Sequence, residues 1–155
     1  LVGSAAAPII VRQYPGERAT LISNSATPQT LAITGSDTWY WGFEVTSGMT
    51  DRRIALNGNI DVYGPRNKII NLAVHDHGGG IGFWVGAVDS EIYGTLIYNV
   101  GFEGLDRGHG HSIYVQNQNG IKKIEDNIHY LLQGFVLKLN FLFLNLYILL
   151  NIVLL

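Results

Sequence analysis

The sequence predicts an all-β solenoid with rungs of about 23 residues, and the first observation behind this is a near-duplication. Residues Asn67–Asp76 resemble Ser90–Asn99, and paired positions such as Ile69 and Ile92 lie 23 residues apart (92 − 69). The second observation is composition, since 19 glycines and 11% aromatic residues in a chain of 155 fit a fold rich in turns. Stacked rungs of this kind form a parallel β-helix, in which each strand pairs with its equivalent one rung away.

The residues before the duplication predict short strands separated by turns. Their apolar runs are short, β-branched or aromatic, and bounded by Gly, Pro, Asn or Ser, which excludes long helices. The expected strands are Ile9–Arg12, Ala19–Ser23, Leu31–Thr34, Trp39–Thr46 and Ile54–Leu56.

Within the repeat, each rung is expected to carry two strands. We match the first, Ile60–Tyr63, to Phe83–Gly86 at 23 residues (83 − 60) and to Ile113–Gln116 at 30 (113 − 83). The second strand is predicted to build an inward apolar ladder from Ile69, Ile92 and Ile124. A polar turn ladder of Asp76 over Asn99 is expected beside it, because short polar side chains tolerate a left-handed backbone.

The period fails once, just after Asn99. Ile92 and Ile124 are 32 residues apart (124 − 92), so an insertion of about seven to nine residues falls near 102–110. Loops that break a regular scaffold often carry function, although a tolerated surface excursion is the alternative.

Four segments then carry a resemblance to a known family. Ala7–Glu17 resembles the entry segment of the right-handed parallel β-helix proteins of the pectate-lyase-like superfamily. Asn67–Asp76, Ser90–Asn99 and Gly110–Asn117 resemble its rungs, and the resemblance covers roughly residues 5–130. It implies a right-handed parallel β-helix, a polysaccharide partner and Ca²⁺ as a possible cofactor. It fixes no activity, because the superfamily contains lyases, hydrolases, epimerases and non-catalytic surface proteins.

Composition divides the chain into a β-helix domain, 1–133, and an apolar tail, 134–155. The tail has three alternative interpretations: a membrane-spanning helix, further β-helix strands, or non-native sequence. A membrane is therefore expected as a partner only if the tail is a genuine span.

Charge and cysteine content exclude other classes of function. The net charge is −2 with no basic stripe, which argues against nucleic acid as a partner. There is no cysteine, so disulfides and Cys-metal sites are excluded. The chain starts at Leu1 without a visible signal peptide, and we expect a fragment of a secreted or cell-surface protein.

The insertion holds the candidate catalytic residues: Glu103, Asp106, Arg107, His109 and His111. In a polysaccharide lyase, Arg107 would neutralise a uronate carboxylate and His109 or His111 would remove a proton. A hydrolase would need two carboxylates, for which Glu103 with Asp106, or Asp76 with Asp106, are the pairs available. The alternative is a solvated loop.

Four histidines form two His-x-His pairs, His75 with His77 and His109 with His111. Residues i and i+2 of a strand share a face, so each pair can aim two imidazoles at one point. This suits a transition metal, whose identity the sequence leaves unknown, or a substrate, for which His75 and His77 are our candidates. The alternative is polar turn residues at the ends of rungs.

Aromatic residues supply the candidate sugar contacts. Trp84 and Tyr114 are expected at equivalent positions of neighbouring rungs, as an outward platform beside the insertion. Trp39, Trp41 and Phe43 are expected on one face of their strand, where core filling is favoured over sugar stacking. The sequence thus predicts an extracellular β-helix that binds a polysaccharide, with lyase-like or hydrolase-like cleavage left open. A non-catalytic surface or structural module is the competing prediction.

Overall fold

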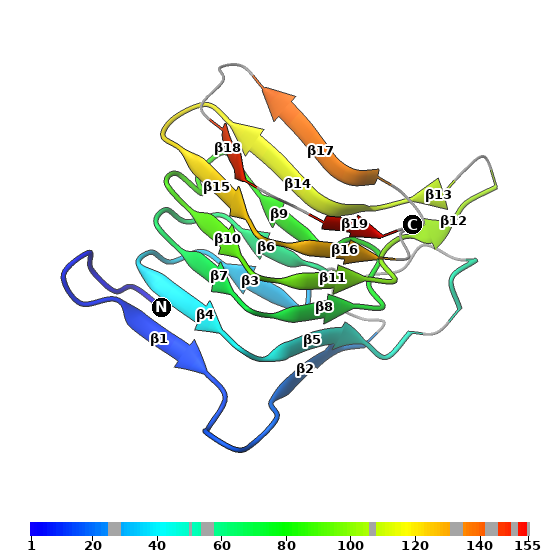
Figure 1. Cartoon of the computed structure of the whole chain (residues 1–155), viewed down its shortest axis with the longest axis horizontal. Coiled ribbons are helices and arrows are strands. Elements are labelled where there is room, and N and C mark those ends of the chain that lie inside the picture. The colour runs from blue at the N-terminus through cyan, green and yellow to red at the C-terminus, as the bar shows by residue number, and fades with distance from the viewer. Residues whose placement is uncertain are drawn as a thin grey trace.

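The protein is a parallel β-helix of three sheets, seen in a computed structural model that describes residues 1–24, 29–49, 51–53, 58–105, 108–130, 135–141, 146–149 and 152–154 (Figure 1). The first sheet contains β1 (Ile9–Arg12), β4 (Thr38–Trp41), β7 (Lys68–Ile70), β10 (Glu91–Tyr93), β15 (Lys122–Glu125) and β18 (Leu146–Leu149). The second contains β2 (Thr20–Ser23), β5 (Glu44–Ser47), β8 (Ala73–His75), β11 (Leu96–Tyr98), β16 (Ile128–Tyr130) and β19 (Ile152–Leu154). The third contains β3 (Leu31–Ile33), β6 (Ile60–Val62), β9 (Ile81–Phe83), β14 (His111–Asn117) and β17 (Phe135–Phe141). The predicted fold class is confirmed.

Each rung carries three strands, so the prediction of two was wrong. A sharp bend divides the second predicted strand into one strand of the first sheet and one of the second. The bend falls at the same place in four successive rungs and uses a left-handed backbone, at Gly42 (φ 74°), Asn71 (φ 50°), Gly94 (φ 61°) and Asp126 (φ 53°). Gly, Asn and Asp adopt this conformation most easily, so a single residue can turn the chain inside an otherwise apolar run.

The inward ladder of isoleucines is confirmed. Ile92 pairs with Ile69 on one side and Ile124 on the other, and all three are buried. Asp76 and Asn99 also have left-handed backbones, and the Asn99 side-chain amide donates a hydrogen bond to the Asp76 carboxylate. The steps of 23 and 32 residues in the first sheet therefore locate the rungs correctly.

The register of the third sheet differs from the predicted one by two residues. Ile60 pairs with Ile81, not Phe83, and Phe83 pairs with Val115, not Ile113. A shift of two residues leaves every side chain on the same face, so the alternation of apolar residues could not reveal it. Consequently Trp84 and Tyr114 are not at equivalent positions.

The interior contains polar ladders as well as apolar ones. The Asn67 side chain accepts a hydrogen bond from the Thr38 backbone N–H at 3.0 Å, and Asn127 accepts one from the Thr95 N–H at 2.9 Å. All four residues are buried. Buried amides of this kind satisfy backbone groups at the bends, where strand pairing is interrupted.

The aromatic strand β4 presents its tryptophans outward. Tyr40 is buried at 6% exposure, whereas Trp41 is 39% exposed on the opposite face. Phe43 is also buried, because the bend at Gly42 intervenes between it and Trp41. Core filling is thus correct for Phe43 and wrong for the exposed Trp41.

The described segments of the C-terminal tail are strands. β17, β18 and β19 pair in parallel with β14, β15 and β16, and so extend all three sheets. Among the residues the structure describes, no helix is long and apolar enough to cross a membrane.

Candidate functional site

Three aromatic rings from successive rungs meet on the outward face of the third sheet. The rings of Tyr63 and Trp84 stack with centroids 5.8 Å apart and planes 10° apart. Tyr114 packs edge-on against Trp84, with centroids 5.4 Å apart. We call Tyr63, Trp84 and Tyr114 the aromatic platform. Trp84 lies level with Tyr63 and Gln116, and Tyr114 lies level with Asp61 and Gly82.

A single buried carboxylate organises this platform. Asp61 is 2% exposed, and its Oδ1 accepts hydrogen bonds from the Trp84 indole N–H at 2.8 Å and from the Asn59 amide at 2.7 Å. Its Oδ2 accepts one from the Tyr63 hydroxyl at 3.3 Å. Three hydrogen bonds converge on this one carboxylate, so Asp61 fixes the orientation of two rings at once.

Glycine at position 82 makes room for this arrangement. Gly82 stands between Asp61 and Tyr114 in the sheet. A Cβ atom at Gly82 would lie 2.7 Å from Asp61 Oδ1 and 3.2 Å from Trp84 Nε1, closer than carbon atoms normally approach such groups. The absence of a side chain there lets the Trp84 indole reach the carboxylate of the preceding rung.

Amide side chains surround the platform with hydrogen-bonding groups. Gln116 donates to the Tyr114 hydroxyl at 2.8 Å, and Gln29 donates to the Tyr63 hydroxyl at 3.4 Å. Tyr63 is 37% exposed. Half-exposed ring faces bordered by amides and hydroxyls suit a ligand that is apolar on one face and rich in hydroxyl groups at its edge.

The insertion folds as a hairpin and reaches the platform. β12 (Phe102–Glu103) and β13 (Gly108–His109) pair antiparallel, and the His109 ring stacks on Phe102 at 5.0 Å. His111 starts β14, and its ring lies 5.7 Å from that of Tyr114. Of the candidate catalytic residues, Asp106 and Arg107 lie outside the described residues.

A loop of the second rung holds this hairpin in place. The Arg52 guanidinium donates to the backbone oxygen of Asn99 at 2.7 Å and also to that of Gly101. The backbone oxygen of Arg52 accepts a bond from the Glu103 N–H at 2.7 Å. Burial lowers the pKa of Arg52, and the nearby Asp76 opposes this effect. Glu103 is therefore anchored through its backbone, with its side chain exposed.

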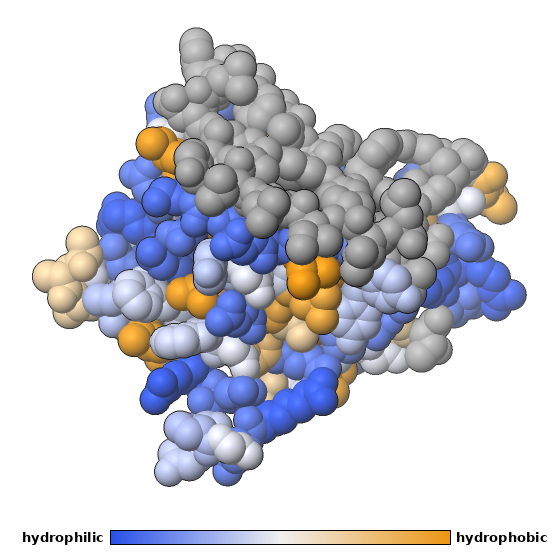
Figure 2. Space-filling model, in the orientation of Figure 1, coloured by the Kyte–Doolittle hydropathy of each residue, from blue (hydrophilic) through white to orange (hydrophobic). Residues whose placement is uncertain are grey.

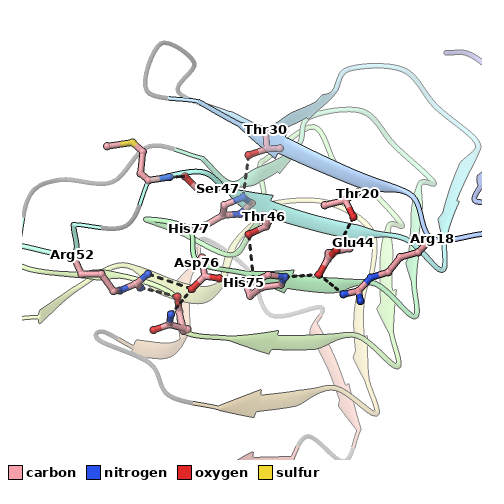
Figure 3. Close-up of polar contacts among 12 residues, drawn as sticks. Arg18, Thr20, Thr30, Glu44, Thr46, Ser47, Arg52, His75, Asp76 and His77 are labelled. Carbon is pink, nitrogen blue, oxygen red and sulfur yellow. Dashed lines mark hydrogen bonds and ion pairs between the residues drawn. The ribbon is translucent and has the colours of Figure 1, made fainter.

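The outward face of the second sheet carries a chain of paired charges (Figure 3). His75 lies between two carboxylates, with Nε2 2.9 Å from Glu44 and Nδ1 2.6 Å from Asp76. Arg18 pairs with Glu44 at 2.5 Å, and Arg52 lies 4.0 Å from Asp76. We call Arg18, Glu44, His75, Asp76 and Arg52 the charged network.

Hydrogen bonds from Thr20 and from members of the charged network hold Glu44 ionised. The Thr20 hydroxyl, followed by His75 and Arg18, lowers the pKa of Glu44 to about 2. The Tyr98 ring stacks on His75 with centroids 4.6 Å apart and covers the imidazole from the next rung. Each charge in the network already has a partner, so it links rungs together without leaving a free group.

His77 lies on the interior side, away from His75 (Figure 3). It is fully buried, and its Nε2 is 3.1 Å from the Thr30 hydroxyl. Burial lowers the pKa of His77 to about 4, against an opposing effect of the Thr46 backbone. The left-handed backbone of Asp76 breaks the strand alternation, which is why this His-x-His pair does not share a face.

The structure therefore separates the predicted site residues into groups. Trp84, Tyr114 and His111 meet on the third sheet, His109 belongs to the hairpin, and His75 and His77 take part in contacts between rungs. No group of three or more His, Asp or Glu side chains that could hold a metal ion occurs in the described part of the chain.

Sequence reasoning gave no site role to Tyr63, Asp61, Glu44, Arg18 or Arg52. The first two would have followed from the correct register, because Tyr63 is level with Trp84 and Asp61 precedes it by two residues on the same face. The remaining three act through contacts between rungs, which depend on loop lengths that no local pattern reveals.

Comparison with known proteins gives no relative: no family model, no curated protein and no solved structure matches this chain. The architecture rests on the strand pairing itself.

Proposed function

We propose that this chain binds a polysaccharide along the outward face of its third sheet, as a secreted or cell-surface β-helix of the pectate-lyase-like type. The observation that carries the proposal is the aromatic platform, in which Tyr63, Trp84 and Tyr114 come from three successive rungs. Aromatic faces provide large apolar contacts with little loss of side-chain entropy, and sugar rings have an apolar face to match.

The geometry favours a linear polymer as the ligand. Successive strands in a sheet are about 4.8 Å apart, so rings contributed by neighbouring rungs form a row along the axis of the solenoid. The row is rigid, because Asp61 orients two of its rings and each ring packs against the next. A preformed surface loses little entropy on binding, which supports useful affinity from few contacts.

Binding is tested with the whole chain on a panel of neutral and uronate-containing polysaccharides. We expect Trp84→Ala to weaken binding about tenfold or more, the effect of losing a central aromatic anchor. Tyr93→Ala is the matched control, because Tyr93 is 40% exposed but lies on the first sheet. Equal effects of the two substitutions would contradict the proposal.

Cleavage is a second candidate, favoured by the contact between His111 and Tyr114 that brings the insertion to the platform. Absorbance of unsaturated uronate and release of reducing ends, each measured with and without Ca²⁺, distinguish lyase, hydrolase and non-catalytic alternatives. If neither assay detects product from a polysaccharide that the chain binds, the enzyme alternative is wrong and the non-catalytic binding module is supported.

A further inference from the structure

A second surface has the features of a ligand site and plays no part in the aromatic platform. It lies at the corner where the first sheet bends into the second, in the first three rungs. Two adjoining cavities of about 190 and 310 Å³ share Gln13 and Gly42 in their lining. The larger volume is at the lower end of the range for small-ligand sites. We call the two cavities together the corner groove.

Aromatic and polar side chains line the corner groove together. Trp41 is 39% and Tyr14 73% exposed, and both line the smaller cavity beside Arg12. Asn71 and Glu44 line the larger one. A tryptophan beside amide and carboxylate groups also marks the platform, and the corner groove adds the guanidinium groups of Arg12 and Arg18.

Arg12 is the unpaired cation of this surface. Arg18, Arg52, Arg53 and Arg66 each have a carboxylate within 4.0 Å. Arg12 has no such partner among the residues that the structure describes. It is the direct neighbour of Trp41 across the sheet, so its guanidinium and the indole share one face. A guanidinium binds a carboxylate through two parallel hydrogen bonds, which makes it the natural group for an acidic ligand.

Gly42 keeps the groove open. A Cβ atom on Gly42 would meet no other atom within 4 Å, so it would project into the groove. The equivalent bend residue in the next rung is Asn71, which adopts the same left-handed backbone (φ 50° against 74°) with a side chain present. Glycine is thus not the only residue the bend accepts, and its presence here leaves the floor of the groove bare.

We propose that the corner groove is a second sugar subsite, specific for a uronate unit whose ring stacks on Trp41 and whose carboxylate pairs with Arg12. This subsite rests on the proposed function for its ligand class, and it adds a preference for acidic over neutral chains. Among the described residues, no Lys or Arg lines the platform, so we assign the acidic preference to the corner groove.

The test compares uronate polysaccharides with their carboxyl-reduced forms, which keep the same backbone without the charge. We expect the wild-type chain to bind the acidic form at least fivefold more tightly. Arg12→Gln removes that preference. Trp41→Ala and Gly42→Asn weaken binding of the acidic form about fivefold, while Trp84→Ala weakens both forms and preserves their ratio.

Arg53→Gln is the matched control, because Arg53 is equally exposed but pairs with Asp51 in another loop. Circular dichroism and thermal unfolding establish that each variant is folded, and Gly42→Asn keeps a residue that the bend already uses one rung later. The proposed subsite is wrong if carboxyl reduction leaves the affinity unchanged, or if Arg12→Gln has the same affinities as Arg53→Gln. In either case, a loss of affinity in Trp84→Ala still supports the platform. Loss of binding in Trp41→Ala but not in Trp84→Ala would overturn the platform and leave the subsite.

Discussion

The outward faces of the third and second sheets differ in what their side chains contact. On the third sheet, one carboxylate, Asp61, holds the rings of Tyr63 and Trp84 and leaves both side chains partly exposed. On the second sheet, two arginines, two carboxylates and the imidazole of His75 are paired with one another along the rungs. A surface whose polar groups pair with each other stabilises the fold. A surface with oriented and partly exposed aromatic rings is available to a ligand. The two faces should therefore respond oppositely to substitution.

The largest expected effect is a loss of stability in acid, and it arises at His77, which is buried just after β8 of the second sheet. The pKa of His77 falls from 6.5 to about 4 on folding, so the folded protein favours neutral His77. Its contribution is complete above pH 6.5 and is lost as the pH falls toward 4, by roughly 3 kcal/mol at most. Urea unfolding between pH 7 and 5.5 measures the onset of this loss, above the pH range in which Glu44 of the unfolded chain, with a pKa of 4.5, takes up most of its proton.

His77→Gln is the comparison for that measurement. The substitution removes the titrating imidazole and keeps His75, Asp76 and Arg52, the other charges that act on the site. We expect the variant to lose less stability than the wild type over this pH range. Identical slopes would show that His77 is not the group responsible.

His75→Ala should destabilise the protein by about 1–3 kcal/mol, since Glu44 and Asp76 lose the group between them. Because the network lies on a different sheet from the platform, affinity for a carboxyl-reduced polysaccharide, which the corner groove does not select, should not change. Chemical denaturation and a binding titration on the same preparation measure both quantities. A variant of unchanged stability but weakened binding would reverse our assignment of the two faces.

Gly82→Ala should have a smaller effect on stability and a specific effect on binding. The new methyl group would lie 2.7 Å from Asp61 Oδ1 and force the carboxylate or the Trp84 indole to move. We expect an affinity loss of several-fold, with a stability loss of about 1–2 kcal/mol from the disturbed contacts. Gly16→Ala is unsuitable as its control because of its left-handed backbone, whereas Gly79→Ala meets its nearest atom at 3.6 Å and serves well.

Leu96→Ser should have the smallest effect. Leu96 is 39% exposed on β11 and pairs with Ile128, which is 38% exposed. Figure 2 shows hydrophobic side chains over the second sheet among otherwise hydrophilic ones. Substitutions at such partly exposed positions change stability by about 0.5 kcal/mol or less. A thermal shift of more than a few degrees, or any change in affinity, would mean that this face has a role we have not assigned.

Much of the scaffold was predictable because it repeats. The ladder of Ile69, Ile92 and Ile124 and the insertion after Asn99 both follow from one period in the sequence. The bend at Asn71 was missed, because one residue in a left-handed conformation turns the chain without interrupting the apolar pattern.

The candidate site was less predictable than the scaffold. Trp84 and Tyr114 do meet, but the predicted register was shifted by two residues. It put Asp61 level with Trp84, where the structure has Tyr63, and so hid the stacking of Tyr63 on Trp84. A period-2 pattern distinguishes the two faces of a strand but not the position along it. A register shifted by two residues therefore still matches apolar residues with apolar residues. Contacts such as Arg52 with Asn99 join residues 47 apart and depend on the path of the intervening loop.

The most direct test of the central claim observes the tryptophan side chains during binding. The chain has three tryptophans, and the indole N–H signals in a ¹⁵N correlation spectrum can be assigned with single Trp→Phe variants. The Trp84 signal is expected to be distinct, because this N–H donates to Asp61. On titration with a carboxyl-reduced polysaccharide, we predict a saturable shift of the Trp84 signal, with Trp39 and Trp41 unchanged. A bound polysaccharide that leaves Trp84 unshifted would contradict the account.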